Sequence, residues 1–165
     1  MYLLDAPIVF ELRKAASGHA EPGLTDWATG VARERLFLSA LTLLELETHA
    51  IRTERRDKAE GGALRNWIDG HVMRAFDGRV LAIDAAVVRR RGQIAIADSR
   101  DALLAATALE HSLTLVTRNG AAFKGARVKT FDPRGYRAAA ADEELDWRSA
   151  ARTGPFWLKN LFVRS

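Results

Sequence analysis

The chain has 165 residues, of which 48% are hydrophobic and 28% charged, a composition typical of one folded globular domain. It contains no cysteine, which excludes disulfides, thiolate metal sites and cysteine nucleophiles. No apolar run approaches the roughly 18 residues needed to cross a bilayer, and the N-terminus lacks the charge order of a secretion signal. We therefore expect a cytoplasmic protein that contacts no membrane and binds any metal through oxygen or imidazole ligands.

The net charge is +4, from 25 Lys and Arg against 21 Asp and Glu. Such a surface attracts phosphate backbones, but a modest excess of arginine is also common on solvated helix faces. Charge alone therefore leaves contact with nucleic acid open.

Short apolar runs alternate with helical patterns in the first half of the chain. Residues 2–4 read as a strand, and Pro7 suits the first turn of a helix that reaches about Lys14. A second helical pattern covers residues 24–34 and a second strand residues 36–39. Thr42-Leu-Leu-Glu45 then has the form of a capping box at the start of a third helix.

The same alternation continues in the second half. The predicted elements are a helix over 59–76, a strand over 79–83, a helix capped by Asp84, an alanine-rich helix after Asp98, a turn at His111-Ser112, and strands over 113–116 and 125–131. Strands that alternate with helices predict an α/β fold with a mostly parallel sheet.

The composition changes after Pro133. Residues 134–165 contain an alanine run, an acidic patch and several aromatic residues, the last at Phe162. We expect one domain over residues 1–133, followed by a C-terminal helix and an aromatic-rich arm that packs on the domain or on a partner.

Four polar residues occupy comparable places in this pattern. Asp5 and Asn119 follow strands, whereas Glu45 and Asp101 open helices. In a parallel sheet these places share the carboxyl edge, where ligands bind. Clustered carboxylates raise one another's pKa unless a cation neutralises them, and a hard divalent ion such as Mg²⁺ or Mn²⁺ suits oxygen ligands.

Each acid also has a structural interpretation. Glu45 would complete the capping box, and Asp101 stands three residues after a possible cap at Asp98. Taken singly, each of these acids fits a capping role, but the joint placement of four groups favours a shared site. His49 lies four residues after Glu45 on one helix face, and we expect it to face solvent.

Basic residues could guide RNA where they lie near the acidic edge. Arg13, Lys14 and Arg118 are the nearest in this arrangement, and we predict possible RNA contacts for them. The remaining arginine runs are more typical of solvated faces.

These residues resemble the PIN domain, specifically VapC-type toxins of bacterial toxin-antitoxin pairs, with the FitB-like branch most similar. The resemblance rests on four segments across residues 1–133: Tyr2 to Asp5, Ser39 to Leu46, Asp101 to Asn119, and Phe131-Asp-Pro133. It implies a three-layer α/β/α sandwich around a mostly parallel sheet. It also implies frequent homodimers and a VapB-like antitoxin partner, through which alone operator DNA would be bound.

The resemblance further implies a Mg²⁺-dependent endoribonuclease. Asp5, Glu45 and Asp101 match the three acids of the family motif, as metal ligands and catalytic residues, and Asn119 matches a fourth catalytic position that carries Asp or Asn. The implied chemistry is hydrolysis of an RNA phosphodiester by a metal-activated water, with a carboxylate to orient or deprotonate that water. The general base is not assigned among the acids.

The chain departs from the family pattern at two places. Asp5 is followed by Ala6-Pro7 instead of Thr-Asn, and Ala122 stands where many relatives carry another Asp. These departures support an alternative hypothesis, a degenerate PIN domain with little or no nuclease activity that acts as an antitoxin-binding, regulatory module.

Overall fold

A computed structural model describes residues 1–137, apart from the side chains of residues 16 and 17. Its centre is a sheet in which every pairing is parallel, with the strand order β3-β2-β1-β4-β5. The strands are β1 (Tyr2–Leu4), β2 (Leu36–Ser39), β3 (Val80–Leu81), β4 (Thr114–Val116) and β5 (Thr130–Phe131). The predicted parallel α/β fold is confirmed.

Helices connect the strands in the way that parallel pairing requires. The α-helices are α1 (Ala6–Arg13), α2 (Pro22–Gly30), α3 (Ala40–Glu54), α4 (Lys58–Trp67), α5 (Met73–Ala75), α6 (Ala85–Arg91) and α7 (Ser99–Glu110). Short 3₁₀ segments cover Lys14–Ser17, Arg33–Arg35 and Gly120–Ala126, and a π-helical turn covers Ile68–Val72.

Side chains alternate between two cores on opposite faces of the sheet. Leu4 and Val116 belong to one core, which includes residues of α1, α2, α3 and α4. Leu3 and Leu115 belong to the other, which includes residues of α6, α7 and the 3₁₀ segment after β4. Because successive strand residues point to opposite faces, two buried faces make a three-layer sandwich, as predicted.

The chain reverses direction across the sheet at β1. From this central strand it proceeds to β2 and β3 on one side, and only later to β4 and β5 on the other. Ligands of open α/β sheets bind at such a switch point, beyond the carboxyl ends of the strands. Asp5 follows β1 directly and Thr117 follows β4, and the Asp5 N–H donates to the Val116 carbonyl at 3.2 Å.

Some predicted boundaries are wrong. The capping box at Thr42 does not exist: α3 begins at Ala40, the Ser39 hydroxyl caps it at the Leu41 N–H, and the Thr42 hydroxyl instead donates to the Leu4 carbonyl at 3.1 Å. Glu45 therefore lies in the second turn and caps nothing. The helix predicted over 59–76 is interrupted by the π-helical turn, and the last strand shrinks to Thr130–Phe131.

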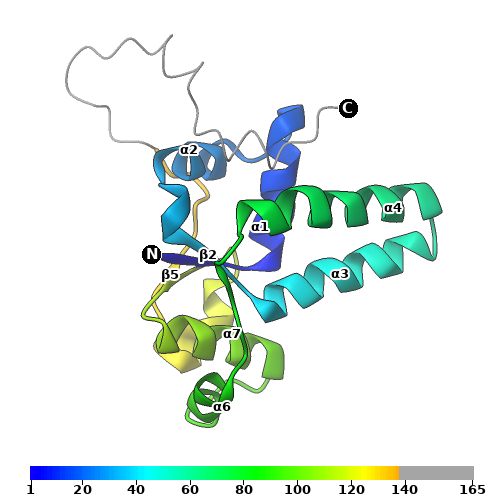
Figure 1. Cartoon of the computed structure of the whole chain (residues 1–165). Helices are drawn as coiled ribbons and strands as arrows, with labels where there is room; N and C mark the ends of the chain where they lie inside the picture. The colour runs from blue at the N-terminus through cyan, green and yellow to red at the C-terminus, as the bar shows by residue number, and fades with distance from the viewer. Residues whose placement is uncertain (138–165) are drawn as a thin grey trace, which may run out of the picture.

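Helices α3 and α4 lie side by side and extend away from the sheet (Figure 1). Gly61 permits their close approach, because a Cβ there would lie 2.3 Å from the Glu54 Cα. Among the described residues no helix is long and apolar enough to cross a membrane. Tyr136, just beyond Pro133, packs on Phe131 with 6.3 Å between ring centroids, and the helix and arm predicted further on lie outside the described residues.

Candidate active site

A cavity of about 290 Å³ opens at the switch point of the sheet, and we call it the acidic cavity. Four separate segments contribute to it: the loop after β1, helix α3, the start of α7 and the loop after β4. Its lining residues are Asp5, Pro7, Glu45, Asp98, Arg100, Asp101, Leu104, Thr117, Asn119 and Phe123. All four polar residues that the sequence placed at this edge are among them.

Asp5 is the most buried of these acids, with 7% of its surface exposed. It is the N-cap of α1, where its Oδ1 accepts from the Ile8 N–H at 3.0 Å. Burial raises the pKa of Asp5, and the Asp101 charge raises it further, whereas the Thr117 hydroxyl, the Ile8 N–H and the Arg118 charge oppose this rise. The capping interpretation is thus correct for Asp5, yet the same carboxylate also lines the cavity.

Thr117 links the two loops at the switch point. Its side-chain oxygen accepts from the Asn119 N–H at 3.1 Å, and its hydroxyl lowers the pKa of Asp5. The residue is 1% exposed, so its geometry is fixed by packing. Sequence reasoning missed Thr117, although its position directly after β4, two residues before Asn119, was the available signal.

Glu45 reaches the cavity from α3 and is held by Arg100, whose Nη2 lies 2.6 Å from Glu45 Oε1. The pKa of Glu45 is raised by burial, lowered by the Arg100 guanidinium, and raised by the Asp5 and Asp101 charges. Sequence reasoning did not single out Arg100. This arginine is the positive charge that balances the carboxylate in the structure.

Asp101 lies in the first turn of α7, next to its cap. The Asp98 Oδ1 accepts from the N–H groups of Arg100 and Asp101, both at 2.9 Å, so Asp98 caps the helix as predicted. Burial raises the pKa of Asp101, and the Asp98 charge raises it further. Asp98 also lines the acidic cavity, a second role that sequence reasoning did not assign.

The donor set of the acidic cavity fits a hard divalent cation, because Asp5, Glu45, Asp101 and Asn119 present oxygen ligands and the carboxylates repel one another. Within residues 1–137, however, no three Asp, Glu, His or Cys side chains stand close enough to enclose a metal ion. In the structure the Arg100 guanidinium forms an ion pair with the Glu45 carboxylate. The Arg100 guanidinium and a divalent ion would therefore compete for the charge of the Glu45 carboxylate.

The basic residues predicted near RNA are not among the residues that line the acidic cavity. The Arg118 Nη1 lies 3.6 Å from Glu11 Oε2, and the Lys14 amine lies 3.2 Å from the same oxygen. The Arg13 guanidinium stands 5.5 Å from the centroid of the Trp67 ring. Their contact with RNA stays a prediction.

The residues that depart from the family pattern differ in their position relative to the acidic cavity. Ala6 is buried, whereas Pro7 is exposed and lines the cavity, where its ring supplies no N–H. Ala122 is half-buried against the second core and is not a lining residue. The departure that reaches the cavity is therefore the one after Asp5.

The fold and the cavity together define an α/β domain with an acidic site at its topological switch point. The model of the PIN domain family matches residues 2–140, and the chain belongs to this family.

Two proteins and one solved structure are similar to this chain. The chain is 36% identical over 75 residues to the ribonuclease VapC14 of Mycobacterium tuberculosis, covering 46% of this chain and 70% of that protein. It is 29% identical over 142 residues to the toxin FitB of Neisseria gonorrhoeae, covering 81% and 98%. The crystal structure of FitAcB from Neisseria gonorrhoeae superposes with a TM-score of 0.72 at 28% identity, over 81% of this chain and 98% of that one.

Proposed function

We propose that the protein is the toxin of a type II toxin-antitoxin pair and acts in the cytoplasm as a Mg²⁺- or Mn²⁺-dependent endoribonuclease. The observation that carries this proposal is the acidic cavity, in which Asp5, Glu45, Asp101 and Asn119 line one space at the switch point. The names of the relatives, a ribonuclease and a toxin, supply the substrate class.

Each residue has a part in this proposal. Asp5, Glu45 and Asp101 would hold the divalent ion, and the Asn119 amide would position the attacking water or the phosphate. The bound ion supplies a Lewis acid for the phosphoryl group and a water of lowered pKa. One of these carboxylates would orient or deprotonate the attacking water.

The proposal includes a partner. Its parts are a small VapB-like antitoxin that blocks the site and binds operator DNA, and a homodimer of this chain; the similarity to the toxin FitB supports the toxin role. Co-expression with the antitoxin should relieve growth arrest caused by the protein alone.

The deciding experiment compares two aspartates with the same backbone geometry. Asp84 caps α6 through Oδ1 and the Val87 N–H at 3.0 Å, as Asp5 caps α1 at 3.0 Å, but Asp84 does not line the acidic cavity. Asp5→Asn should reduce Mn²⁺-dependent RNA cleavage by at least about 100-fold, the size expected for an acid-base group, and should remove growth arrest. Asp84→Asn should behave as wild type, and equal activity of all three proteins would refute the nuclease proposal.

The alternative is a binding module that does not cleave RNA. It is favoured by Ala6-Pro7 beside Asp5 and by the Arg100 guanidinium on Glu45. Under this alternative wild type and Asp5→Asn both fail to cleave RNA at any Mn²⁺ concentration, while both still capture the antitoxin in a pull-down.

A further inference from the structure

A second cavity of about 330 Å³ adjoins the acidic cavity, and we call it the flanking cavity. The two cavities share Pro7, Glu45 and Arg100 in their linings. The two cavities are therefore adjacent on the molecule.

The flanking cavity lies between matched faces of α1 and α3. Glu45, Thr48, His49 and Arg52 follow the spacing of one helix face on α3, and Pro7 and Phe10 do the same on α1. Both helices are tied to the end of β1, one by the Asp5 cap and the other by the Thr42 bond to Leu4. The cavity is therefore formed by rigid elements.

An aromatic pair forms one wall of this cavity. The Phe10 and His49 rings meet at 4.7 Å between centroids with an angle of 62°. Phe10 is in turn stacked on Trp67 at 6.1 Å and 28°. The imidazole of His49 thus contacts Phe10, which in turn stacks on Trp67. The rest of the imidazole surface is exposed to solvent.

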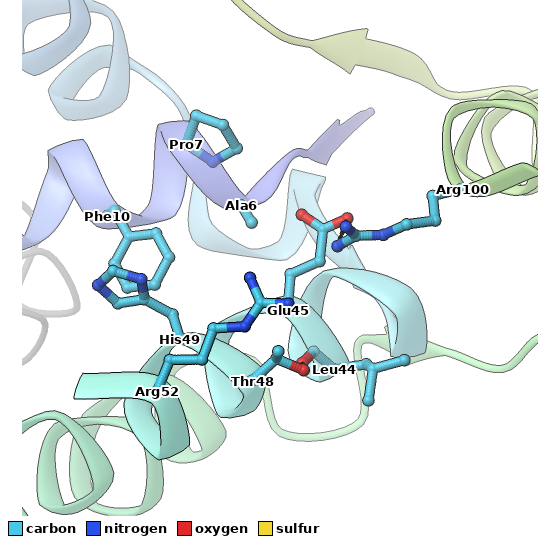
Figure 2. A pocket seen from close by; sticks show the side chains of 9 residues that line it. All are labelled: Ala6, Pro7, Phe10, Leu44, Glu45, Thr48, His49, Arg52 and Arg100. Atoms are coloured by element: carbon cyan, nitrogen blue, oxygen red, sulfur yellow. Dashed lines mark hydrogen bonds and ion pairs between the residues drawn. The ribbon is translucent and has the colours of Figure 1, made fainter. Parts of the chain in front are cut away.

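Two guanidinium groups supply positive charge. Figure 2 shows Arg52 and Arg100 extending into the region around Glu45 from different sides, with the Phe10–His49 pair next to Arg52. In the described part of the chain Arg52 has no ion pair or side-chain hydrogen bond. Glu45 is the one acid of this lining, so the flanking cavity carries more positive than negative groups.

We propose that the flanking cavity binds the nucleotide next to the cleaved phosphodiester, with Arg52 on its phosphate and the Phe10–His49 pair against its base. This proposal rests on the proposed ribonuclease function. Proteins that bind single-stranded RNA typically use these two kinds of contact, arginine to phosphate and aromatic ring to base. The shared lining with the acidic cavity favours RNA over a protein segment, since the cleaved strand has to continue out of that cavity.

The test separates binding from cleavage. In an Asp101→Asn background, which the proposed function predicts to bind RNA without cutting it, fluorescence anisotropy measures the affinity for a short labelled single-stranded RNA. Adding Arg52→Gln should weaken binding by about three- to tenfold. It should also reduce the slope of log affinity against log salt concentration by roughly the amount that one phosphate contact contributes. Adding His49→Ala should weaken binding by about fivefold or more, the usual loss for a base-ring contact.

Matched controls lie outside both cavities. Arg56 is an exposed arginine just beyond α3, and His111 is an exposed histidine after α7. Arg56→Gln and His111→Ala should leave RNA affinity unchanged. In the active chain, Arg52→Gln should raise KM for RNA more than it lowers kcat, because Arg52 is not among the residues that line the acidic cavity.

A modified RNA tests the base contact directly. After the cleavage position is mapped with wild type, an abasic ribose is placed at each flanking nucleotide in turn. At one of them the His49→Ala effect should vanish, because the base that His49 contacts is missing.

Two results would overturn the inference and leave the ribonuclease proposal standing, and a third would overturn both. Unchanged RNA affinity in Arg52→Gln and His49→Ala, with wild type still cleaving RNA, refutes the subsite alone. Loss of antitoxin capture with unchanged RNA affinity assigns the flanking cavity to a protein partner. Absence of both RNA binding and RNA cleavage in the wild-type chain refutes both proposals.

Discussion

Arg100 and Glu45 form an ion pair that joins α7 to α3 across the acidic cavity, with 2.6 Å between Nη2 and Oε1. The arginine precedes Asp101 directly and lines both cavities. A divalent ion and this guanidinium compete for one carboxylate. Arg100 is therefore a counterion, within the same chain, of the Glu45 carboxylate that the proposed metal would use as a ligand.

Removal of this counterion should strengthen metal binding. Arg100→Gln is expected to lower the dissociation constant for Mn²⁺ by about two- to fivefold, since an ion pair as exposed as this one contributes up to about 1 kcal/mol. Titration of Mn²⁺ followed by electron paramagnetic resonance measures the change.

The control for this variant is Arg90→Gln. Arg90 pairs with Glu110 at 3.0 Å on α6 and α7 and does not line the acidic cavity. Its Mn²⁺ affinity should equal that of wild type. Unchanged or weaker binding in Arg100→Gln would contradict the competition.

Mn²⁺ should stabilise the folded protein through the acidic cavity. At a free concentration about 100 times the dissociation constant the gain is about 2.7 kcal/mol, which raises the melting temperature of a domain of this size by roughly 5–10 °C. Asp101→Asn should abolish this shift, as measured by differential scanning fluorimetry. A Mn²⁺-induced shift that survives in Asp101→Asn would place the ion elsewhere.

The raised pKa of Asp5 predicts how stability changes with pH. Between the ordinary carboxyl value and the raised native pKa, the folded chain binds more protons than the unfolded chain, so stability falls as pH increases through this window. Asp5→Asn removes the buried charge and keeps an oxygen for the Ile8 N–H. The variant should be more stable than wild type at neutral pH, by roughly 0.5–2 kcal/mol.

Urea unfolding at several pH values measures this difference. The advantage of Asp5→Asn should shrink on acidification and disappear below the ordinary pKa of an aspartate. Asp84→Asn, the exposed cap of the same geometry, should follow the wild-type curve. An advantage of Asp5→Asn that is constant across the pH range would show that ionisation of Asp5 is not its cause.

Two adjacent glycines of α4 should respond in opposite ways to alanine. A Cβ at Gly61 would lie 2.3 Å from the Glu54 Cα, whereas a Cβ at Gly62 meets nothing within 4 Å. Gly61→Ala should separate α3 from α4 at a cost of about 1–3 kcal/mol. Gly62→Ala should stabilise the chain by about 0.5–1 kcal/mol, because alanine is the better helix former. Thermal unfolding measures both, and equal effects would contradict the close approach at Gly61.

The sequence by itself determined the order and type of most elements. Strand β2 begins and ends where its apolar run predicts, and Asp84 and Asp98 cap the helices that they precede. Alternating strands and helices also predicted the parallel sheet. These features follow from the sequence because strand runs, helix periodicity and N-caps depend on residues a few positions apart.

Only the tertiary structure decided which further groups contact the four polar residues that the sequence had placed at one edge of the sheet. Thr42 and Glu45 fit a capping box by spacing, but the Thr42 hydroxyl donates to the Leu4 carbonyl, and α3 begins three residues earlier than the box predicts, with Ser39 as its N-cap. Arg100 on Glu45, Thr117 beside Asp5, and the Phe10–His49 pair join residues from different elements. Such contacts depend on how the helices pack around β1, and no local pattern in the chain encodes that packing.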